Sequence, residues 1–199
     1  MDAKTKNGFL KKIIGGIIIF CIVLILGTVF IARAYLNTYR LFTQRHLVAV
    51  VECQKALKGR QPVLFVELYP ETEAAQKKTL FFNADEWVIE GHMVLWKPVF
   101  GIFGAQRYYR LERISGRYRD IEKEKKEVRL VYSLSEQPDR FWAFIYRYQR
   151  FIPFVEAAYG NSAFVPFEPG KKFNVYVTYY GFMIKQVSEP KKRSWWSVG

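Results

Sequence analysis

The 199-residue sequence has few of the residues that build metal centres and disulfide frameworks. Cys21 lies in a long apolar run and Cys53 stands alone in the remainder, so no disulfide can join two cysteines of the soluble part. The two histidines, His46 and His92, have no cysteine or carboxylate at a spacing typical of zinc. We therefore predict no disulfide, no metal site and no cofactor, and we expect Cys53 to be a small buried hydrophobe on a strand.

Sequence motifs of the common enzyme classes are also missing. The chain has no GxSxG turn, no phosphate-binding P-loop, no dinucleotide fingerprint and no HExxH. One dispersed alternative is an acid–base group formed by His92 with Asp85, Glu86 or Glu90. A histidine among alternating strand residues is more often structural. We therefore predict a protein that is not an enzyme.

Apolar residues are abundant but unevenly distributed along the chain, which is 50% hydrophobic and 18% aromatic. Residues 13–32 carry no charge, and as a helix they match the roughly 30 Å thickness of a bilayer hydrocarbon core. We predict a transmembrane helix over residues 13–35, preceded by a basic flank over residues 1–12. The side chains expected to anchor it are Ile13, Ile17, Phe20, Leu24, Val29 and Ile31.

Two other interpretations of this segment stay open. The basic flank and the small-residue run 32–34 also fit a cleaved signal peptide, but the apolar run exceeds the usual length of about 7 to 15 residues. A helix packed against the domain would need a polar stripe, which the run lacks. We favour an uncleaved single-pass signal-anchor with its amino terminus inside. In a Gram-negative bacterium the anchor would lie in the inner membrane, with the following domain in the periplasm.

Basic residues outnumber acidic ones after the predicted span. Residues 36–199 contain 26 basic and 17 acidic side chains, a surplus that attracts polyanions. A chain held on the outer side of a membrane rarely meets nucleic acid, and the GxxG at 101–104 lacks the basic residues of an RNA-clamping loop. We therefore predict contact with the lipid bilayer and with a membrane or envelope protein partner, and no nucleic acid.

Short apolar or alternating runs bounded by turn residues predict eight strands. They cover residues 47–54, 63–69, 79–83, 86–97, 107–113, 127–133, 162–167 and 173–187. The run 63–69 is almost wholly apolar, so we expect it to be buried on both faces. These strands form a soluble domain over 47–188, joined to the span by a juxtamembrane segment, 36–46, and followed by a basic tail with tryptophans, 189–199.

One segment breaks the β pattern. Apolar residues at helical spacing predict an amphipathic helix near 138–158, with the arginines of the segment towards other faces. The spaced residues are Phe141, Phe144, Ile145, Tyr148, Ile152 and Val155. Pro138 suits the first turn, Pro153 should kink the helix and Gly160 should end it. The predicted fold class is mainly β (α+β): one N-terminal transmembrane helix, then an antiparallel β sandwich or partial barrel packed by this helix.

Three segments are candidates for contact with other molecules. The apolar turn 97–104 either folds back over the core, which we favour, or faces a bilayer or partner. The tail combines cations with indoles, so a membrane-interface segment and a disordered tail are equally open. The mixed-sign run 117–127 is typical of a solvated turn, with a docking loop as the alternative. The predicted partner or membrane contacts are Phe100, Ile102, Phe103, Arg140, Arg147, Arg150, Trp195 and Trp196.

The stretches 87–91, 95–97 and 109–118 resemble a group of poorly characterised Gram-negative single-span membrane proteins. Members of this group are sometimes labelled cation or multidrug efflux pump. A transporter needs several spans around a polar midplane site, which one apolar span does not provide. The resemblance therefore implies, at most, a subunit that assists a pump made by other chains, and it implies no catalytic residues.

Two functional hypotheses follow from the sequence. The first is a non-enzymatic, single-pass membrane-anchored domain that acts as an accessory or assembly subunit of a membrane or envelope complex. The second is a membrane-tethered carrier or sensor that binds a lipid or other apolar ligand in a β shell. The expected lining of that shell is Phe65, Phe81, Phe82, Trp87 and Trp96. A large apolar pocket would favour the second hypothesis, and a filled core the first.

Overall fold

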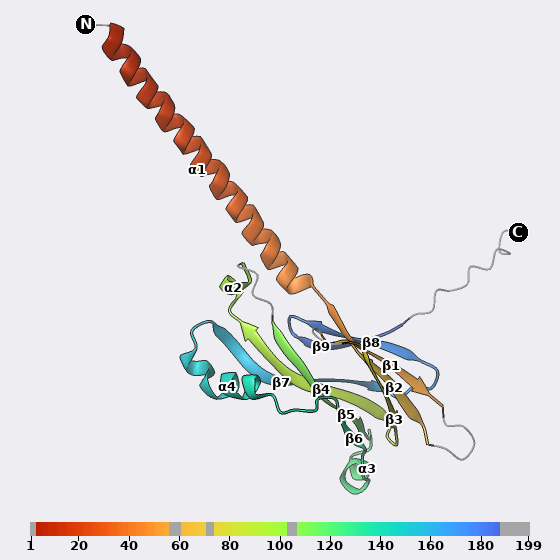
Figure 1. The fold of residues 1–199 in the computed structure, drawn as a ribbon. Helices are drawn as coiled ribbons and strands as arrows, with labels where there is room; N and C mark the ends of the chain where they lie inside the picture. The colour runs from red at the N-terminus through yellow and green to blue at the C-terminus, as the bar shows by residue number, and fades with distance from the viewer. Residues whose placement is uncertain (1–2, 56–60, 71–73, 103–106, 188–199) are drawn as a thin grey trace, which may run out of the picture. The chain divides into compact units, whose positions relative to one another are not determined.

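The computed structural model describes residues 3–55, 61–70, 74–102 and 107–187 (Figure 1). The chain divides into two units. One unit contains the long helix α1 (Ala3–Thr43) and the short helix α2 (Pro98–Ile102), and the other contains all the described strands. The sequence-based prediction of one N-terminal helix followed by a mainly β domain is confirmed.

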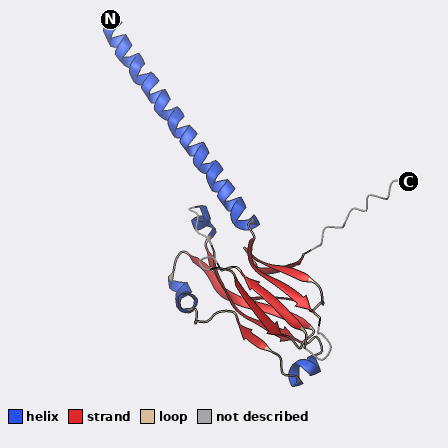
Figure 2. Cartoon of the chain, turned by 45° about the vertical axis from the view of Figure 1, so that its right-hand side comes forward, coloured by secondary structure: helices blue, strands red, loops and turns tan. Residues whose placement is uncertain are grey.

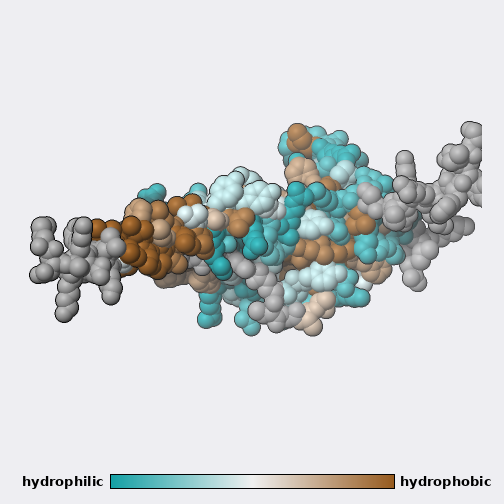
Figure 3. All heavy atoms as spheres, turned by 90° about the horizontal axis from the view of Figure 1, so that it is seen from above, coloured by the Kyte–Doolittle hydropathy of each residue, from teal (hydrophilic) through white to brown (hydrophobic). Residues whose placement is uncertain are grey.

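Helix α1 is 41 residues long, which corresponds to about 60 Å at the rise of an α-helix. Its segment Ile13–Arg40 is long and apolar enough to cross a membrane, and none of its most apolar window is buried. The middle of α1 is accordingly brown, the colour of apolar residues, in Figure 3. All six predicted anchor side chains are exposed. The helix also continues through most of the predicted juxtamembrane segment.

The nine described strands form two antiparallel sheets that pack as a sandwich (Figures 1 and 2). The first sheet has the order β3-β2-β1-β8-β9. Its strands are β1 (His46–Gln54), β2 (Val63–Leu68), β3 (Gln76–Phe81), β8 (Lys172–Thr178) and β9 (Gly181–Gln186). The second sheet has the order β6-β5-β4-β7. Its strands are β4 (Glu86–Trp96), β5 (Tyr108–Arg117), β6 (Val131–Ser133) and β7 (Val155–Pro166).

The core lies between the two sheets and is filled by alternating strand residues. Trp87 of β4 is fully buried and meets Phe173 of β8 edge to face, with ring centroids 5.7 Å apart. Cys53 of β1 is also fully buried, and burial raises the pKa of its thiol to about 11. The predicted role of Cys53 as a small buried hydrophobe on a strand is confirmed.

The two edges of the sandwich are built differently. At one edge β7 and β9 lie together, and the backbone N–H of Phe182 donates to Oδ1 of Asn161 over 2.8 Å. Gly181 precedes this bond with a φ of +142°, and a Cβ there would lie 2.5 Å from the Asn161 amide, so this position requires glycine. At the opposite edge Lys78 of β3 donates to the carbonyl of Ser133 of β6 over 3.3 Å.

Several predicted boundaries are wrong. The predicted strand 173–187 is two strands, β8 and β9, because the chain turns at 179–180 just before Gly181. Strand β7 begins at residue 155, so Gly160 lies inside a strand and does not end a helix. Phe65 of β2 is 39% exposed on the outer face of its sheet, so the predicted burial of that strand on both faces is also wrong.

The predicted amphipathic helix is shorter than expected and is turned differently. It consists of α4 (Arg140–Tyr148) and the 3-10 turn η1 (Gln149–Phe151), and it ends before Pro153, which lacks the N–H needed to continue it. Ile145 is buried against Val94, Val155 and Ala158 on the outer face of the second sheet. Phe141, Phe144 and Tyr148, which the helical spacing placed on the apolar side of the helix, are instead 47%, 56% and 42% exposed.

Two other short helices occupy segments that were expected to be turns. Helix α3 (Ile121–Lys126) lies in the mixed-sign run, begins at the N-cap Asp120 and has no buried residue. Helix α2 lies in the apolar run 97–104, where Val99 and Phe100 are 51% and 38% exposed. Whether this run folds back over the core stays a prediction, because α2 and the sandwich belong to different units.

Candidate functional site

A β-bulge shapes the outer face of the second sheet. Glu90 of β4 pairs with Arg113 and the next residue, Gly91, pairs with Leu111, so Glu112 is the extra residue on β5. The strands approach so closely that a Cβ on Gly91 would lie 2.2 Å from a backbone oxygen of β5. The bulge brings the outward-facing polar side chains of β5 level with His92 of β4.

His92 is the centre of a compact polar cluster on this face. Its ring stacks on Trp142 of α4, with centroids 3.8 Å apart and planes 6° apart. Its Nε2 lies 3.1 Å from a carboxylate oxygen of Glu112, and its Nδ1 lies 3.8 Å from Oδ2 of Asp139. We call His92, Glu112, Asp139, Tyr108 and Trp142 the His92 cluster. It joins β4, β5 and α4.

Asp139 connects the cluster to the start of α4. Its buried carboxylate caps the helix by accepting the backbone N–H of Trp142 over 2.9 Å. The same carboxylate accepts the hydroxyl of Tyr108 over 2.9 Å. Burial raises the pKa of Tyr108 to about 12, and the hydrogen bond to Asp139 adds to the shift. Tyr108 is therefore a protonated donor at neutral pH.

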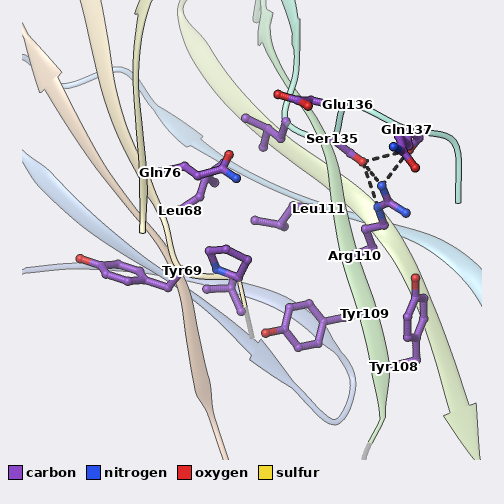
Figure 4. A pocket seen from close by; sticks show the side chains of 13 residues that line it. Leu68, Tyr69, Gln76, Tyr108, Tyr109, Arg110, Leu111, Ser135, Glu136 and Gln137 are labelled. Carbon is purple, nitrogen blue, oxygen red and sulfur yellow. Dashed lines mark hydrogen bonds between the residues drawn. The ribbon is translucent and has the colours of Figure 1, made fainter. Parts of the chain in front are cut away.

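A cleft of about 540 Å³ lies beside this cluster, near the end strands β3 and β6 of the two sheets. Apolar side chains from both sides of the sandwich form its floor: Val48, Leu68, Leu111 and Leu134. In Figure 4, Leu68, Tyr69 and Gln76 border the cleft from one sheet, and Tyr109 and Leu111 from the other. A second hollow of about 180 Å³ includes His92 and shares with the cleft Arg110, Ser135, Glu136 and Gln137.

Arg110 is fixed where the two hollows meet. Its Nε donates to Oγ of Ser135 over 2.9 Å, and its Nη2 donates to the backbone carbonyl of Gln137 over 2.8 Å, as the dashed lines in Figure 4 show. Nη2 also donates to Oγ of Ser135, and together these three bonds hold the plane of the guanidinium in a single orientation. Glu136 lines the same rim, so the cleft offers charges of both signs together with tyrosine rings and amides.

The chemistry of these groups suits recognition. Ser135 Oγ accepts from Arg110 and donates to the backbone carbonyl of Gln137 over 3.0 Å. A carbonyl is too weak a base to take up this proton, so the contact does not activate the serine as a nucleophile. Within the ranges that the structure describes, no group of three or more histidines, cysteines or carboxylates is placed to hold a metal ion. The cleft can bind an occupant that has both apolar and polar groups.

A second exposed surface lies on α4 and η1. Arg140, Phe144, Arg147 and Tyr148 share the side of α4 that faces away from the sheet, and Arg150 and Phe151 follow on η1. We call these six residues the aromatic–arginine face. All six are exposed, and Phe151 reaches 82%. Between Arg140 and Phe154 the sequence contains no Asp or Glu, so the positive charge has no acidic neighbour within this segment.

The structure places the predicted contact residues in different regions. The three predicted arginines lie together on the aromatic–arginine face, while Phe100 lies on α2 and is exposed. The side chain of Ile102, and residues Phe103, Trp195 and Trp196, lie outside what the structure describes.

The five aromatic residues predicted to line an apolar shell do not share a cavity. Phe82 and Trp87 are buried in the core, whereas Phe65 and Phe81 are exposed on the outer face of their sheet. Trp96 packs instead against the ring of Phe154, with centroids 5.9 Å apart. That prediction is wrong, because successive side chains of a strand point to opposite faces.

The acid–base alternative for His92 also named the wrong carboxylates. Glu86 bonds to Arg119 over 2.9 Å, Glu90 bonds to Arg113, and Asp85 accepts the backbone N–H of Arg119. The true neighbours of His92 come from β5 and from the start of α4, 20 or more residues away. One signal was present in the sequence, because Asp139 follows a proline and precedes a helical run, as an N-cap does.

Comparisons with protein families, with curated proteins and with solved structures gave no match to this chain.

Proposed function

We propose that this protein is a non-enzymatic, single-pass membrane-anchored binding domain that serves as an accessory or assembly subunit of a membrane or envelope complex. Helix α1 is the anchor, and in a Gram-negative cell it would lie in the inner membrane with the sandwich in the periplasm. The observation that carries the proposal is the cleft around Arg110, where apolar side chains lie beside a guanidinium held in place by hydrogen bonds.

The lining favours a segment of a partner protein as the occupant. An extended peptide offers apolar side chains for the Leu68 and Leu111 floor, and backbone and polar groups for Gln76, Arg110 and Glu136. The cleft also opens beside β3 and β6, which are the end strands of their sheets. End strands present backbone groups to which a peptide can add. A partner made of other chains could be a pump, which would agree with the resemblance noted in the sequence.

The test is photo-crosslinking in cells. We would place a photoreactive phenylalanine at Gln76 or Gln137 in the cleft, and at the 80% exposed Val128 as the control. The proposal predicts an adduct with one membrane or envelope protein from both cleft positions and none from position 128. Arg110→Gln should reduce the adduct. The same adduct from all three positions, or none from the cleft, would contradict the proposal.

A second candidate function is a membrane-tethered carrier or sensor for a lipid or other apolar ligand. The apolar floor of the cleft is the observation that favours it. Native mass spectrometry of the full chain released from detergent would then show a retained small molecule. Leu111→Trp should fill the floor and expel that molecule, while Val128→Trp should leave it bound.

A further inference from the structure

We infer that the aromatic–arginine face docks on the surface of a bilayer that contains anionic phospholipids. This inference rests on the proposed role of α1 as a membrane anchor, but it does not depend on the occupant of the cleft, because the six residues of the face do not line either hollow.

The composition of the face points to a surface that is both apolar and anionic. Its three cations are all arginines, whose planar guanidinium groups can bind two phosphate oxygens at once. They alternate with rings that stand in water, 56% exposed at Phe144 and 82% at Phe151. A lipid headgroup region meets both requirements, because it offers phosphates at the depth where aromatic side chains prefer to lie.

The face is also held in place before any contact is made. Ile145 is buried beneath α4, and Trp142 stacks on both His92 and Tyr146. Gln149 adds a hydrogen bond over 3.0 Å by accepting the backbone N–H of Ala158 in β7. A surface that does not have to fold on contact loses little conformational entropy when it docks.

Helix α1 identifies the bilayer as the occupant rather than a soluble acidic protein. Only Gln44 and Arg45 separate the end of α1 from the start of β1, so a membrane that holds α1 is never far from the sandwich. A short covalent tether makes docking an intramolecular event with a high effective concentration of the bilayer surface. Weak individual contacts are then sufficient for a populated docked state.

The experiment uses the full chain in nanodiscs made of phosphatidylcholine alone, or of equal parts of phosphatidylcholine and phosphatidylglycerol. Hydrogen exchange of the backbone amides of residues 140–151 reports docking. We expect these amides to exchange more slowly in the anionic discs, and the difference to shrink at high salt. The triple variant R140Q/R147Q/R150Q should shift the docking equilibrium by about 100-fold, or about 3 kcal/mol at 1.4 kcal/mol per tenfold.

Two further variants separate the inference from a general effect of charge. K123Q/K125Q/K126Q removes three cations from α3 and should leave docking unchanged. F144Q/F151Q retains every charge and should still weaken docking. Equal exchange in both discs, or equal effects of the two triple variants, would overturn the inference. A photoreactive group at Phe151 should give lipid adducts in cells, and a protein adduct there would also overturn it.

Discussion

Helices α3 and α4 are two short exposed helices of one β sandwich, and they use charge in opposite ways. In α3, Glu122 lies 3.0 Å from Lys125 and 4.0 Å from Lys126, so opposite charges neutralise each other on the surface. In α4 and η1, by contrast, the segment from Arg140 to Phe154 contains no acidic residue, and aromatic rings lie between its arginines. The carboxylate that precedes Arg140, that of Asp139, accepts instead from Tyr108 and from the backbone of Trp142. If α4 docks as proposed, the pairing of charges, rather than their number, distinguishes its surface from the solvated surface of α3.

The largest expected difference between the two helices is in packing. Ile145→Ala should lower the free energy of unfolding by about 3 kcal/mol, because it leaves a cavity beneath α4. Ile121→Ala in α3 should change it by less than about 0.5 kcal/mol, because Ile121 is 69% exposed. Urea unfolding of the full chain in mild detergent, followed by circular dichroism, would measure both. Equal losses would mean that α4 is no better anchored than α3.

The two helix caps should differ by a smaller amount. Asp139→Ala removes the cap of α4 and leaves the Tyr108 hydroxyl without its buried acceptor, so we expect a loss of about 2 kcal/mol. Asp120→Ala removes only the exposed cap of α3, and a loss of about 0.5 to 1 kcal/mol is expected. The same unfolding assay applies, and the reverse order of losses would refute the distinction.

The Tyr108 contact should make part of the stability depend on pH. Its pKa is raised in the folded state from 10 to about 12, so folding binds its proton more tightly. Its contribution is complete below pH 10 and is lost as the pH rises towards 12. Tyr108→Phe should therefore lose less stability than the native chain over that interval. Parallel thermal unfolding curves at stepped pH would test this, and identical pH profiles would contradict it.

The smallest effect is expected from the ion pairs of α3. Glu122→Ala breaks two exposed pairs and should change the free energy of unfolding by less than about 0.5 kcal/mol, because water screens such pairs. A loss above about 1 kcal/mol would show that the pairs order the helix. The difference in anchoring between α3 and α4 would then be smaller than we expect.

Regular patterns in the sequence predicted most of the fold. Strands β1, β2 and β4 were located within one residue at each end, because their apolar runs are bounded by polar or turn residues. The turn before Gly181 was missed because it joins two runs that are both β-like.

The orientation of α4 and the His92 cluster could not be predicted in the same way. Helical spacing alone favours burying Phe141 and Phe144, but Trp142 is drawn inwards by stacking on His92 of another element. The cluster itself depends on the bulge at Glu112, which moves β5 by one residue relative to β4. Contacts of this kind join residues far apart in the chain, and no local period encodes them.

Carbonate extraction at high pH tests most directly whether α1 anchors this domain. Membranes from cells that express the native chain would be washed, and the full length of the protein would be followed by immunoblot. The account predicts that the uncleaved 23.5 kDa chain stays in the membrane pellet. Recovery of the chain in the supernatant, or as a shorter product that has lost the apolar segment, would contradict it.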